Sequence, residues 1–242
     1  MINRRDFLQT SALGAGAMAL FGTSAYAAEL QEADELPSEI LSLRSRVEEA
    51  PPPISESERV ERRERAQSLM DEHGIDALFI EPGASLTYFA GLRWGRSERT
   101  FGLLLPRRGD AVVVCPAFER ERAAKQVDGR FEIRTWEEDE SPFALIGDLM
   151  RSWGTGSGRL AFDEATRHFI VHGVSRDAPS LELVSGDPVT HGCRGRKTAH
   201  EIELMRFANA ITLEAIEAAF RSLREGMTQA ELARNTRAGF ER

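Results

Sequence analysis

The segment 91–99 gathers side chains that suit anion binding. It holds three arginines together with Trp94 and Glu98, between a predicted helix and a predicted strand. The planar guanidinium of an arginine can hold a carboxylate through two parallel hydrogen bonds, and loops on a rigid scaffold commonly carry binding residues. One hypothesis is therefore that Arg93 and Arg99 line a site and grip a carboxylate. The other is that internal Arg–Glu pairs only hold the loop in place, and the sequence leaves both open.

Two histidine patterns suggest metal binding, and neither is complete. His168 and His172 are four residues apart on a predicted helix, so they share a face. No third ligand lies close to them in the sequence, and we expect structural roles. His200-Glu201 begins the pattern of a zinc-peptidase helix, but Leu204 stands where the second histidine belongs. Neither pattern therefore identifies a metal site, and the motifs alone do not indicate a reaction.

Composition narrows the class of protein. The 242 residues carry a net charge of −8, with 41% hydrophobic and 29% charged residues, which is ordinary for a globular protein. An acidic chain argues against nucleic-acid binding, which needs an excess of Lys and Arg. No apolar run is long enough for a membrane span. We expect two unpaired thiols, Cys115 in a buried strand and Cys193 in a glycine-rich polar connection.

The first 27 residues have the order of an export signal. Arg4 and Arg5 precede Phe-Leu, the segment 12–21 is apolar and uncharged, and Ala25-Tyr26-Ala27 ends it as a small-x-small cleavage site. The paired arginines resemble the twin-arginine (Tat) signal, which the Tat machinery recognises in folded proteins. We predict that the mature chain begins at residue 28 and is periplasmic or secreted.

The rest of the chain divides into three parts. Residues 28–54 are acidic, end in three prolines and are predicted to form a tether with some helix over 39–49. Residues 55–190 alternate short strands with helices, which indicates an α/β domain with a mixed sheet. The expected helices cover 55–74, 85–90, 118–127, 142–153 and 165–174, and the expected strands cover 75–80, 100–105, 111–115, 131–136, 159–162 and 181–184.

Residues 191–242 are different, because they consist of a linker and helices only. Thr198 and Glu201 have the spacing of a capping box, and a helix follows that ends at Gly226. Its apolar residues recur at helical spacing. Thr228 begins another capping box. A helix pair that opens here is typical of the start of a second domain.

This tail resembles the start of the pita-bread domain of the creatinase/aminopeptidase P/prolidase family. The similarity is carried by Arg196-Lys197-Thr198, Glu201-Ile202, Met205-Arg206, Ala208-Asn209 and Gly226-Met227-Thr228. Residues 54–190 look like the N-terminal domain of that family, in which Tyr88-Phe89-Ala90-Gly91 matches a recurring Tyr-x-x-Gly element. The resemblance implies a creatinase-like N-terminal domain followed by the first helices of a truncated pita-bread domain.

The family hydrolyses Xaa-Pro peptides with two divalent metal ions, manganese, zinc or cobalt, which activate a bridging water. Its ligands, two Asp, one His and two Glu, belong to the pita-bread domain. The last aspartate here is Asp187, so no catalytic or metal residue is carried over and we expect the chain to be inactive alone. In the family the N-terminal domain supports oligomerisation and narrows access to the active site. The best candidates here for the access role are Arg93, Trp94, Glu98 and Arg99.

Three hypotheses about function follow. The first is a fragment of an exported Xaa-Pro metallopeptidase that forms a homo-oligomer and acts on proline-containing peptides when complete. The second is a stand-alone oligomerisation or binding module that has lost its catalytic half. The third is a creatinase-type amidinohydrolase. In the family the helix that opens at Thr198 packs on a curved sheet, so we also expect its apolar face to lack a complete partner here.

Overall fold

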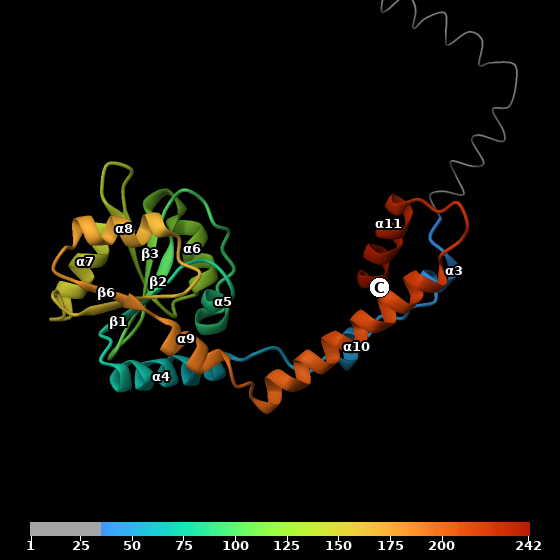
Figure 1. Ribbon diagram of the computed structural model, residues 1–242, viewed down its shortest axis with the longest axis horizontal. Helices are drawn as coiled ribbons and strands as arrows, with labels where there is room; N and C mark the ends of the chain where they lie inside the picture. Colours follow the sequence, from blue (N-terminus) through green and yellow to red (C-terminus); the bar gives the residue numbers. More distant parts are fainter. Residues whose placement is uncertain (1–34) are drawn as a thin grey trace, which may run out of the picture. The chain divides into compact units, whose positions relative to one another are not determined.

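The computed structural model describes residues 35–242, which form two compact units (Figure 1). The α/β unit comprises Pro52–Glu201, and the helical unit comprises the described residues up to Pro51 together with Ile202–Arg242. The predicted Tat signal, with Arg4 and Arg5, lies outside the described residues. Among residues 35–242, no helix combines the length and the apolar character needed to cross a membrane.

The α/β unit is built on a six-stranded mixed sheet in the order β4-β3-β2-β1-β5-β6. The pairs β1–β2 and β2–β3 are antiparallel, whereas β3–β4, β1–β5 and β5–β6 are parallel. The predicted mixed sheet is therefore confirmed. The strands are β1 (Ala77–Ile80), β2 (Gly102–Pro106), β3 (Val112–Pro116), β4 (Glu132–Trp136), β5 (Arg159–Phe162) and β6 (Glu182–Ser185).

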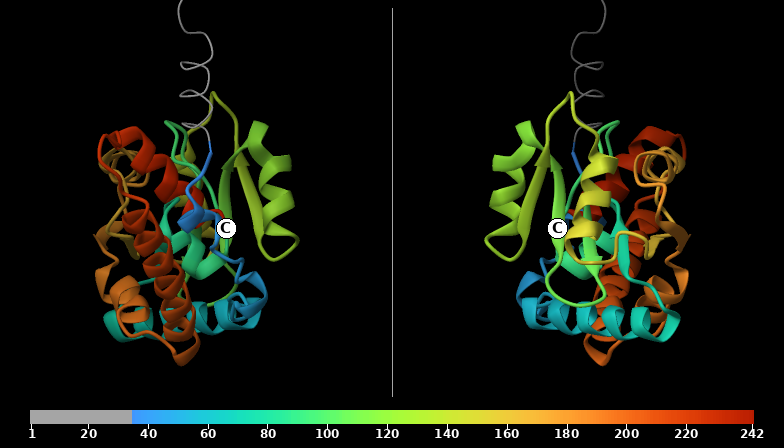
Figure 2. Two further views of the ribbon diagram at one scale, coloured as in Figure 1. Left: turned by 90° about the vertical axis from the view of Figure 1, so that its right-hand side faces the viewer. Right: turned by 90° about the vertical axis from the view of Figure 1, so that its left-hand side faces the viewer.

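Helices cover both faces of this sheet, because its central strands are apolar on both sides. Leu78 and Ile80 point into one core with α4, α5, α6 and α9, and Ala77 and Phe79 point into the other with α7 and α8. Both views of Figure 2 show α4 lying across one side of the strands. The helices are α4 (Glu56–His73), α5 (Ala84–Ala90), α6 (Arg120–Val127), α7 (Pro142–Ser152), α8 (His168–Asp177) and α9 (Asp187–Arg194), with the short turn η2 (Ala117–Glu119) before α6.

The first helix of the unit begins and ends as predicted. Ser55 Oγ accepts a hydrogen bond from the Glu58 backbone N–H at 3.2 Å, and the Glu58 carboxylate accepts one from the Ser55 backbone N–H at 2.8 Å. This capping box satisfies two donors that the first turn of α4 would leave unpaired. Gly74 ends the helix in the left-handed conformation, with φ +63°.

The prediction that Cys193 lies in a polar connection is wrong, because residues 187–194 form the helix α9. Pro188 occupies its first turn, where a missing N–H costs nothing. Gly192 is needed for close packing, since a Cβ there would lie 2.8 Å from Leu69 Cδ1. Cys193 is buried, and Cys115 and Cys193 are both free, as expected. The compact unit thus continues to Glu201 rather than ending near residue 190.

The helical unit contains α3 (Ser38–Leu41), η1 (Val47–Glu49), α10 from residue 202 to Arg221, and α11 (Gln229–Phe240). α10 as a whole spans Ala199–Arg221. Ile40 of α3 is fully buried against Ala218 and Ala219 of α10, so the described part of the predicted tether packs on helices. The tether contains some helix over 39–49, as expected, in two short pieces, α3 and η1. Ser42 Oγ donates to the Glu39 carbonyl at 3.0 Å, which competes with continued helix formation.

The apolar face predicted for α10 is largely exposed. Ile202, Met205 and Ile216 of this face have exposed fractions between 39% and 50%, and Leu223, just after the helix, is 48% exposed. The small residues Ala215, Ala218 and Ala219 are the buried ones. The Thr228 capping box is formed, with the Thr228 hydroxyl accepting from the Glu231 backbone N–H at 3.2 Å.

Candidate functional site

The loop that precedes β2 is anchored by its tryptophan. The Trp94 ring stacks on Phe101 with a centroid distance of 4.1 Å and an interplanar angle of 4°. The Arg122 guanidinium lies 4.1 Å from the centroid of the Trp94 ring. A cation over an indole is attracted by the ring quadrupole. Trp94 therefore fixes the loop to the α/β unit and is itself partly covered.

The arginines of this loop differ in their hydrogen-bond and ion-pair partners. Arg99 Nε donates to Glu138 at 2.7 Å, and its guanidinium also pairs with Glu98. Hydrogen bonding to Glu138 raises the pKa of Arg99. Arg96 donates to the backbone carbonyls of Pro82 and Ala165. Internal pairing, one of the two hypotheses for the loop, is therefore present at Arg99.

Arg93 is the remaining arginine of the loop. Its backbone N–H donates to Gln126 Oε1 at 3.1 Å, which holds the main chain. Its side chain is exposed, and no residue among 35–242 accepts a hydrogen bond from it. Among the predicted access residues, Arg93 is therefore the arginine whose guanidinium is available to bind a ligand.

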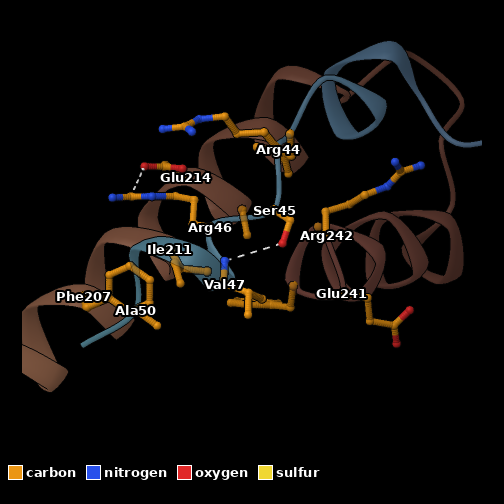
Figure 3. A pocket seen from close by; sticks show the side chains of 14 residues that line it. Arg44, Ser45, Arg46, Val47, Ala50, Phe207, Ile211, Glu214, Glu241 and Arg242 are labelled. Carbon is orange, nitrogen blue, oxygen red and sulfur yellow. Dashed lines mark hydrogen bonds and ion pairs between the residues drawn. The ribbon is translucent and has the colours of Figure 1, made fainter. Parts of the chain in front are cut away.

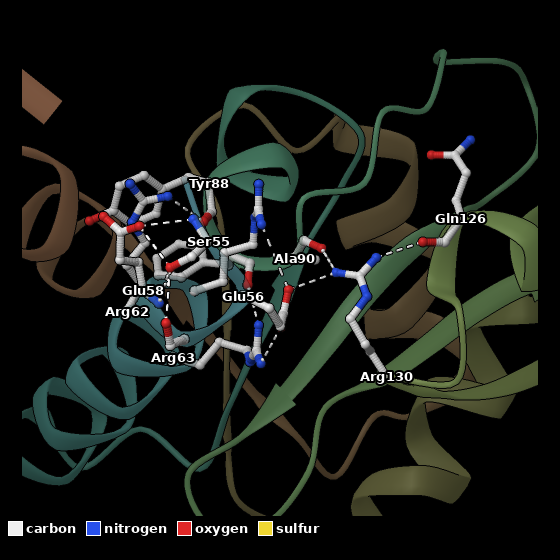
Figure 4. Close-up of polar contacts among 12 residues, drawn as sticks. Ser55, Glu56, Glu58, Arg62, Arg63, Tyr88, Ala90, Gln126 and Arg130 are labelled. Carbon is white, nitrogen blue, oxygen red and sulfur yellow. Dashed lines mark hydrogen bonds and ion pairs between the residues drawn. The ribbon is translucent and has the colours of Figure 1, made fainter. Parts of the chain in front are cut away.

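An arginine cluster that sequence reasoning missed surrounds the C-terminal end of α5 (Figure 4). Three guanidiniums donate to the last three carbonyls of the helix: Arg62 to Tyr88 at 2.9 Å, Arg63 to Phe89 at 2.7 Å and Arg130 to Ala90 at 2.8 Å. Cations are favourable at this end of a helix, where carbonyls lack intrahelical partners. The signal in the sequence was the spacing of Arg59, Arg62 and Arg63, which places all three on one side of α4.

Glu56 is the carboxylate at the centre of this cluster. It lies 2.9 Å from Arg63 and 2.9 Å from Arg130, with each arginine on a different oxygen. Arg59 lies at 3.8 Å from the oxygen that Arg130 contacts. Three cations thus share one anion, and the cluster carries excess positive charge.

The first turn of α10 is clamped to α4 within the α/β unit. Arg62 and Glu201 form an ion pair at 2.6 Å, with both side chains only 11% exposed. His200 Nδ1 lies 2.7 Å from Glu58 Oε1, and this contact holds the pKa of Glu58 at about 2. The Thr198 hydroxyl accepts from the Glu201 backbone N–H at 3.1 Å. His200 and Glu201 therefore have structural partners, as the capping-box interpretation predicted.

Polar groups also gather where β1 and β5 end. Glu81 is fully buried and pairs with Arg167 at 2.5 Å. Asp163 is buried and accepts a hydrogen bond from Ser85 Oγ at 3.1 Å. Burial, together with the neighbouring carboxylate Glu164, raises the pKa of Asp163 to about 7. Within this pair Asp163 therefore holds a proton more readily than Glu164, whose pKa is lowered by its hydrogen bonds.

One group of side chains within residues 35–242 has the spacing of a metal site. Possible ligand atoms of Glu164, Asp187 and His191 lie within 4.8 Å of one another. However, Glu164 already accepts a hydrogen bond from Thr190 at 2.7 Å and lies 3.4 Å from Arg194. His168 and His172 stack at 6.0 Å, and no described third ligand joins them.

The helical unit contains a groove of about 300 Å³ (Figure 3). Arg46 lies in its wall, pairs with Glu214 at 2.8 Å and has its guanidinium 5.4 Å from the Phe207 ring centroid. The groove combines apolar and basic residues, including Val47, Ile211, Phe240 and Arg44. Glu214 already neutralises the charge of Arg46. The groove therefore offers apolar packing rather than a charged binding site.

Comparison with known proteins assigns the chain to a family. Residues 62–195, more than half of the chain, match the Creatinase/Prolidase N-terminal domain. The chain belongs to this creatinase/prolidase family. Residues 1–21 match the signal sequence of the twin-arginine translocation pathway, which confirms the predicted export signal and an extracytoplasmic destination.

The relatives are peptidases and related enzymes of about twice this length. The chain is 31% identical over 203 residues to an uncharacterized peptidase of Schizosaccharomyces pombe, covering 76% of this chain and 44% of that protein. It is 24% identical over 174 residues to the Xaa-Pro dipeptidase of Lactobacillus helveticus, covering 70% and 46%. The chain therefore spans about half the length of the curated relatives it matches.

Solved structures support the fold. A prolidase from Thermococcus sibiricus superposes with a TM-score of 0.68 at 19% identity, over 78% of this chain and 50% of that one. The dipeptidase PepE from Mycobacterium ulcerans gives 0.68 at 22%, over 78% and 51%. The creatinase-like architecture expected from the sequence is confirmed.

Proposed function

We propose that this chain supplies the N-terminal domain and the first catalytic-domain helices of an exported Xaa-Pro metallopeptidase. The observation that carries the proposal is the family match over residues 62–195, combined with the Xaa-Pro dipeptidase of Lactobacillus helveticus among the relatives. In this role the α/β unit binds no catalytic metal. It shapes the path by which a peptide reaches a metal centre located elsewhere in the complete protein.

The described residues do not fit the two-metal centre of the family. Two metal ions need bridging carboxylates and several further ligands. The group Glu164, Asp187 and His191 offers one histidine and two carboxylates, and the cation Arg194 lies 3.4 Å from one of them. No step of peptide hydrolysis is therefore assigned to residues 35–242.

The loop of Arg93, Trp94, Glu98 and Arg99 is proposed to narrow substrate access. Stacking fixes Trp94 on the scaffold, and the pairing of Arg99 with Glu138 orders the end of the loop. Arg93 then presents an exposed guanidinium, which suits the terminal carboxylate of a short Xaa-Pro peptide. If a side chain binds the substrate equally strongly in the ground state and in the transition state, its removal raises KM and leaves kcat unchanged.

Steady-state kinetics on the protein encoded by the complete reading frame test this proposal. We expect Arg93→Ala to raise KM for an Xaa-Pro dipeptide about tenfold at constant kcat, as for a lost charge-assisted hydrogen bond. The matched control is Arg108→Ala, an exposed arginine at the opposite end of β2, which should leave KM unchanged. Equal KM values for wild type and Arg93→Ala would remove the access role from this loop.

Creatinase activity is the second candidate, because a creatinase of Bacillus sp. is 23% identical over 77% of this chain. Creatine supplied in the same assay separates the two reactions. The third hypothesis, an oligomerisation module, is supported by exposed apolar side chains of the helical unit such as Leu213 and Phe220, at 66% and 69% exposed. Sedimentation of the chain over a range of concentrations measures that self-association.

A further inference from the structure

Arg59 is the exception in the arginine cluster at the end of α5. Its side chain is 22% exposed, yet it donates no hydrogen bond to any residue among 35–242. Its Nε atom is buried without a partner in this part of the chain. A guanidinium has five N–H donors, and leaving buried donors unpaired is costly. The Arg59 guanidinium can therefore donate hydrogen bonds to a bound ligand.

The acceptors around Arg59 are already used. The carbonyls of Tyr88, Phe89 and Ala90 accept from the three other arginines. The carbonyl of Thr87 accepts from the Gly91 backbone N–H at 3.0 Å. Glu56 is engaged by Arg63 and Arg130 at 2.9 Å each, so its 3.8 Å contact with Arg59 is the weakest of the three. Every carbonyl of the last turn of α5 thus already accepts a hydrogen bond from another donor, and none of them accepts one from Arg59 among residues 35–242.

The positive charge around Arg59 is only partly compensated. Arg59 and Arg130 face the same oxygen of Glu56, so the two cations lie close together. Burial, and then repulsion from Arg130 and Arg62, lowers the pKa of Arg59, although the carboxylates of Glu56 and Glu58 oppose this shift. An added anion would relieve that repulsion.

Gly91 has no side chain, which lets its backbone pack closely against the Arg59 guanidinium. A Cβ at this position would lie 2.7 Å from Arg59 Nε, and Gly91 has φ +69°. The close approach of the Gly91 backbone holds the Arg59 fork in place, which lowers the entropy lost when a ligand binds.

We propose that Arg59 is the donor of a binding site for a small oxyanion, phosphate or carboxylate, within the positive field of Arg62, Arg63 and Arg130. A planar guanidinium binds two oxygens of such an anion through parallel hydrogen bonds. The proposed site touches the loop only at the Gly91 backbone, does not use the Arg93 side chain and does not depend on peptide hydrolysis.

Calorimetric titration of the purified chain tests the site, with inorganic phosphate in one arm and acetate in the other, at constant ionic strength in chloride. We expect saturable binding of at least one of them, weakened at least tenfold in Arg59→Met. Comparing the phosphate titration with the acetate titration shows whether the site binds a phosphate group or a carboxylate group. The matched control Arg108→Met removes an arginine that is 83% exposed and should bind as the wild type does.

Folding of the variants is checked by circular dichroism. Because Arg59 donates no hydrogen bond to residues 35–242, Arg59→Met should fold, and Arg59→Lys offers a second variant that keeps the charge without the fork. Arg59→Lys should bind at least threefold more weakly than the wild type. Absence of binding by the wild type, or equal binding by wild type and both Arg59 variants, would overturn the proposal. Equal loss in Arg108→Met would overturn it as well.

Discussion

Replacing Arg130 by methionine should destabilise the α/β unit more than any exposed arginine change. Arg130 is 27% exposed and joins α4, α5 and α6. Its guanidinium donates four hydrogen bonds: to Glu56 at 2.9 Å, and to the carbonyls of Ala90 at 2.8 Å, Gln126 at 2.6 Å and Val127 at 3.0 Å. Methionine keeps most of the apolar stem and removes all of these donors.

The expected loss is about 2–3 kcal/mol. Charge-assisted hydrogen bonds contribute roughly 1.5–3 kcal/mol each when nothing replaces them. Here water reaches part of the side chain, and removing Arg130 relieves its repulsion with Arg59, so the four bonds do not add in full. With a urea m-value of about 2 kcal/mol/M, the midpoint should fall by roughly 1 M.

Urea unfolding followed by tryptophan fluorescence measures this unit specifically. The three tryptophans, at positions 94, 136 and 153, all belong to the α/β unit. The control is Arg134→Met, since Arg134 is 48% exposed and has one distant partner, Glu132 at 3.5 Å. That variant should lose less than about 0.5 kcal/mol. If Arg130→Met is as stable as Arg134→Met, the arginine cluster does not stabilise the fold.

Three further predictions concern single positions. Asp163 has a folded pKa of about 7, raised by burial and a neighbouring carboxylate, so its contribution to stability is lost as pH rises from about 4 to 7. Asp163→Asn should therefore remove part of the fall in unfolding free energy between pH 5 and pH 8, and urea titrations at both pH values check this. Gly91→Ala should cost about 1–2 kcal/mol by the same fluorescence assay because of its φ of +69°, whereas Gly95→Ala, with open space around it, should cost far less. Burial raises the pKa of Cys115 to about 12 and that of Cys193 to about 11, so a thiol reagent at pH 8 should label neither until the chain is unfolded.

Much of the fold could be predicted from local patterns. The capping boxes at Ser55 and Thr228 formed as expected, because a Ser or Thr followed three residues later by Glu satisfies backbone donors locally. The two apolar runs around Pro106 paired as an antiparallel hairpin. Alternation of short strands and helices indicated the mixed sheet correctly. These features depend on residues that are close together in the chain.

The features that were missed depend on residues far apart. Arg130 and Glu56 are 74 positions apart, so only the fold shows that they meet. Pairing of the loop arginines with glutamates was one of the two hypotheses, but the partner Glu138, 39 positions from Arg99 and outside the loop, was not visible in the sequence. The helix α9 was obscured by Gly192, whose absent side chain serves contact with Leu69 rather than flexibility.

Two lysine substitutions test the export signal directly. Arg4→Lys combined with Arg5→Lys should stop Tat export, and N-terminal sequencing of exported wild type should begin at Ala28. Export that persists in the double variant would require another export route.

The proposed function requires that this α/β unit works together with a dinuclear catalytic domain. The most direct measurement is the genomic sequence immediately downstream of the codon for Arg242. If the proposed function holds, the reading frame continues and encodes two aspartates, one histidine and two glutamates as the metal ligands. A stop codon directly after Arg242 would contradict it and would favour a stand-alone binding or oligomerisation module.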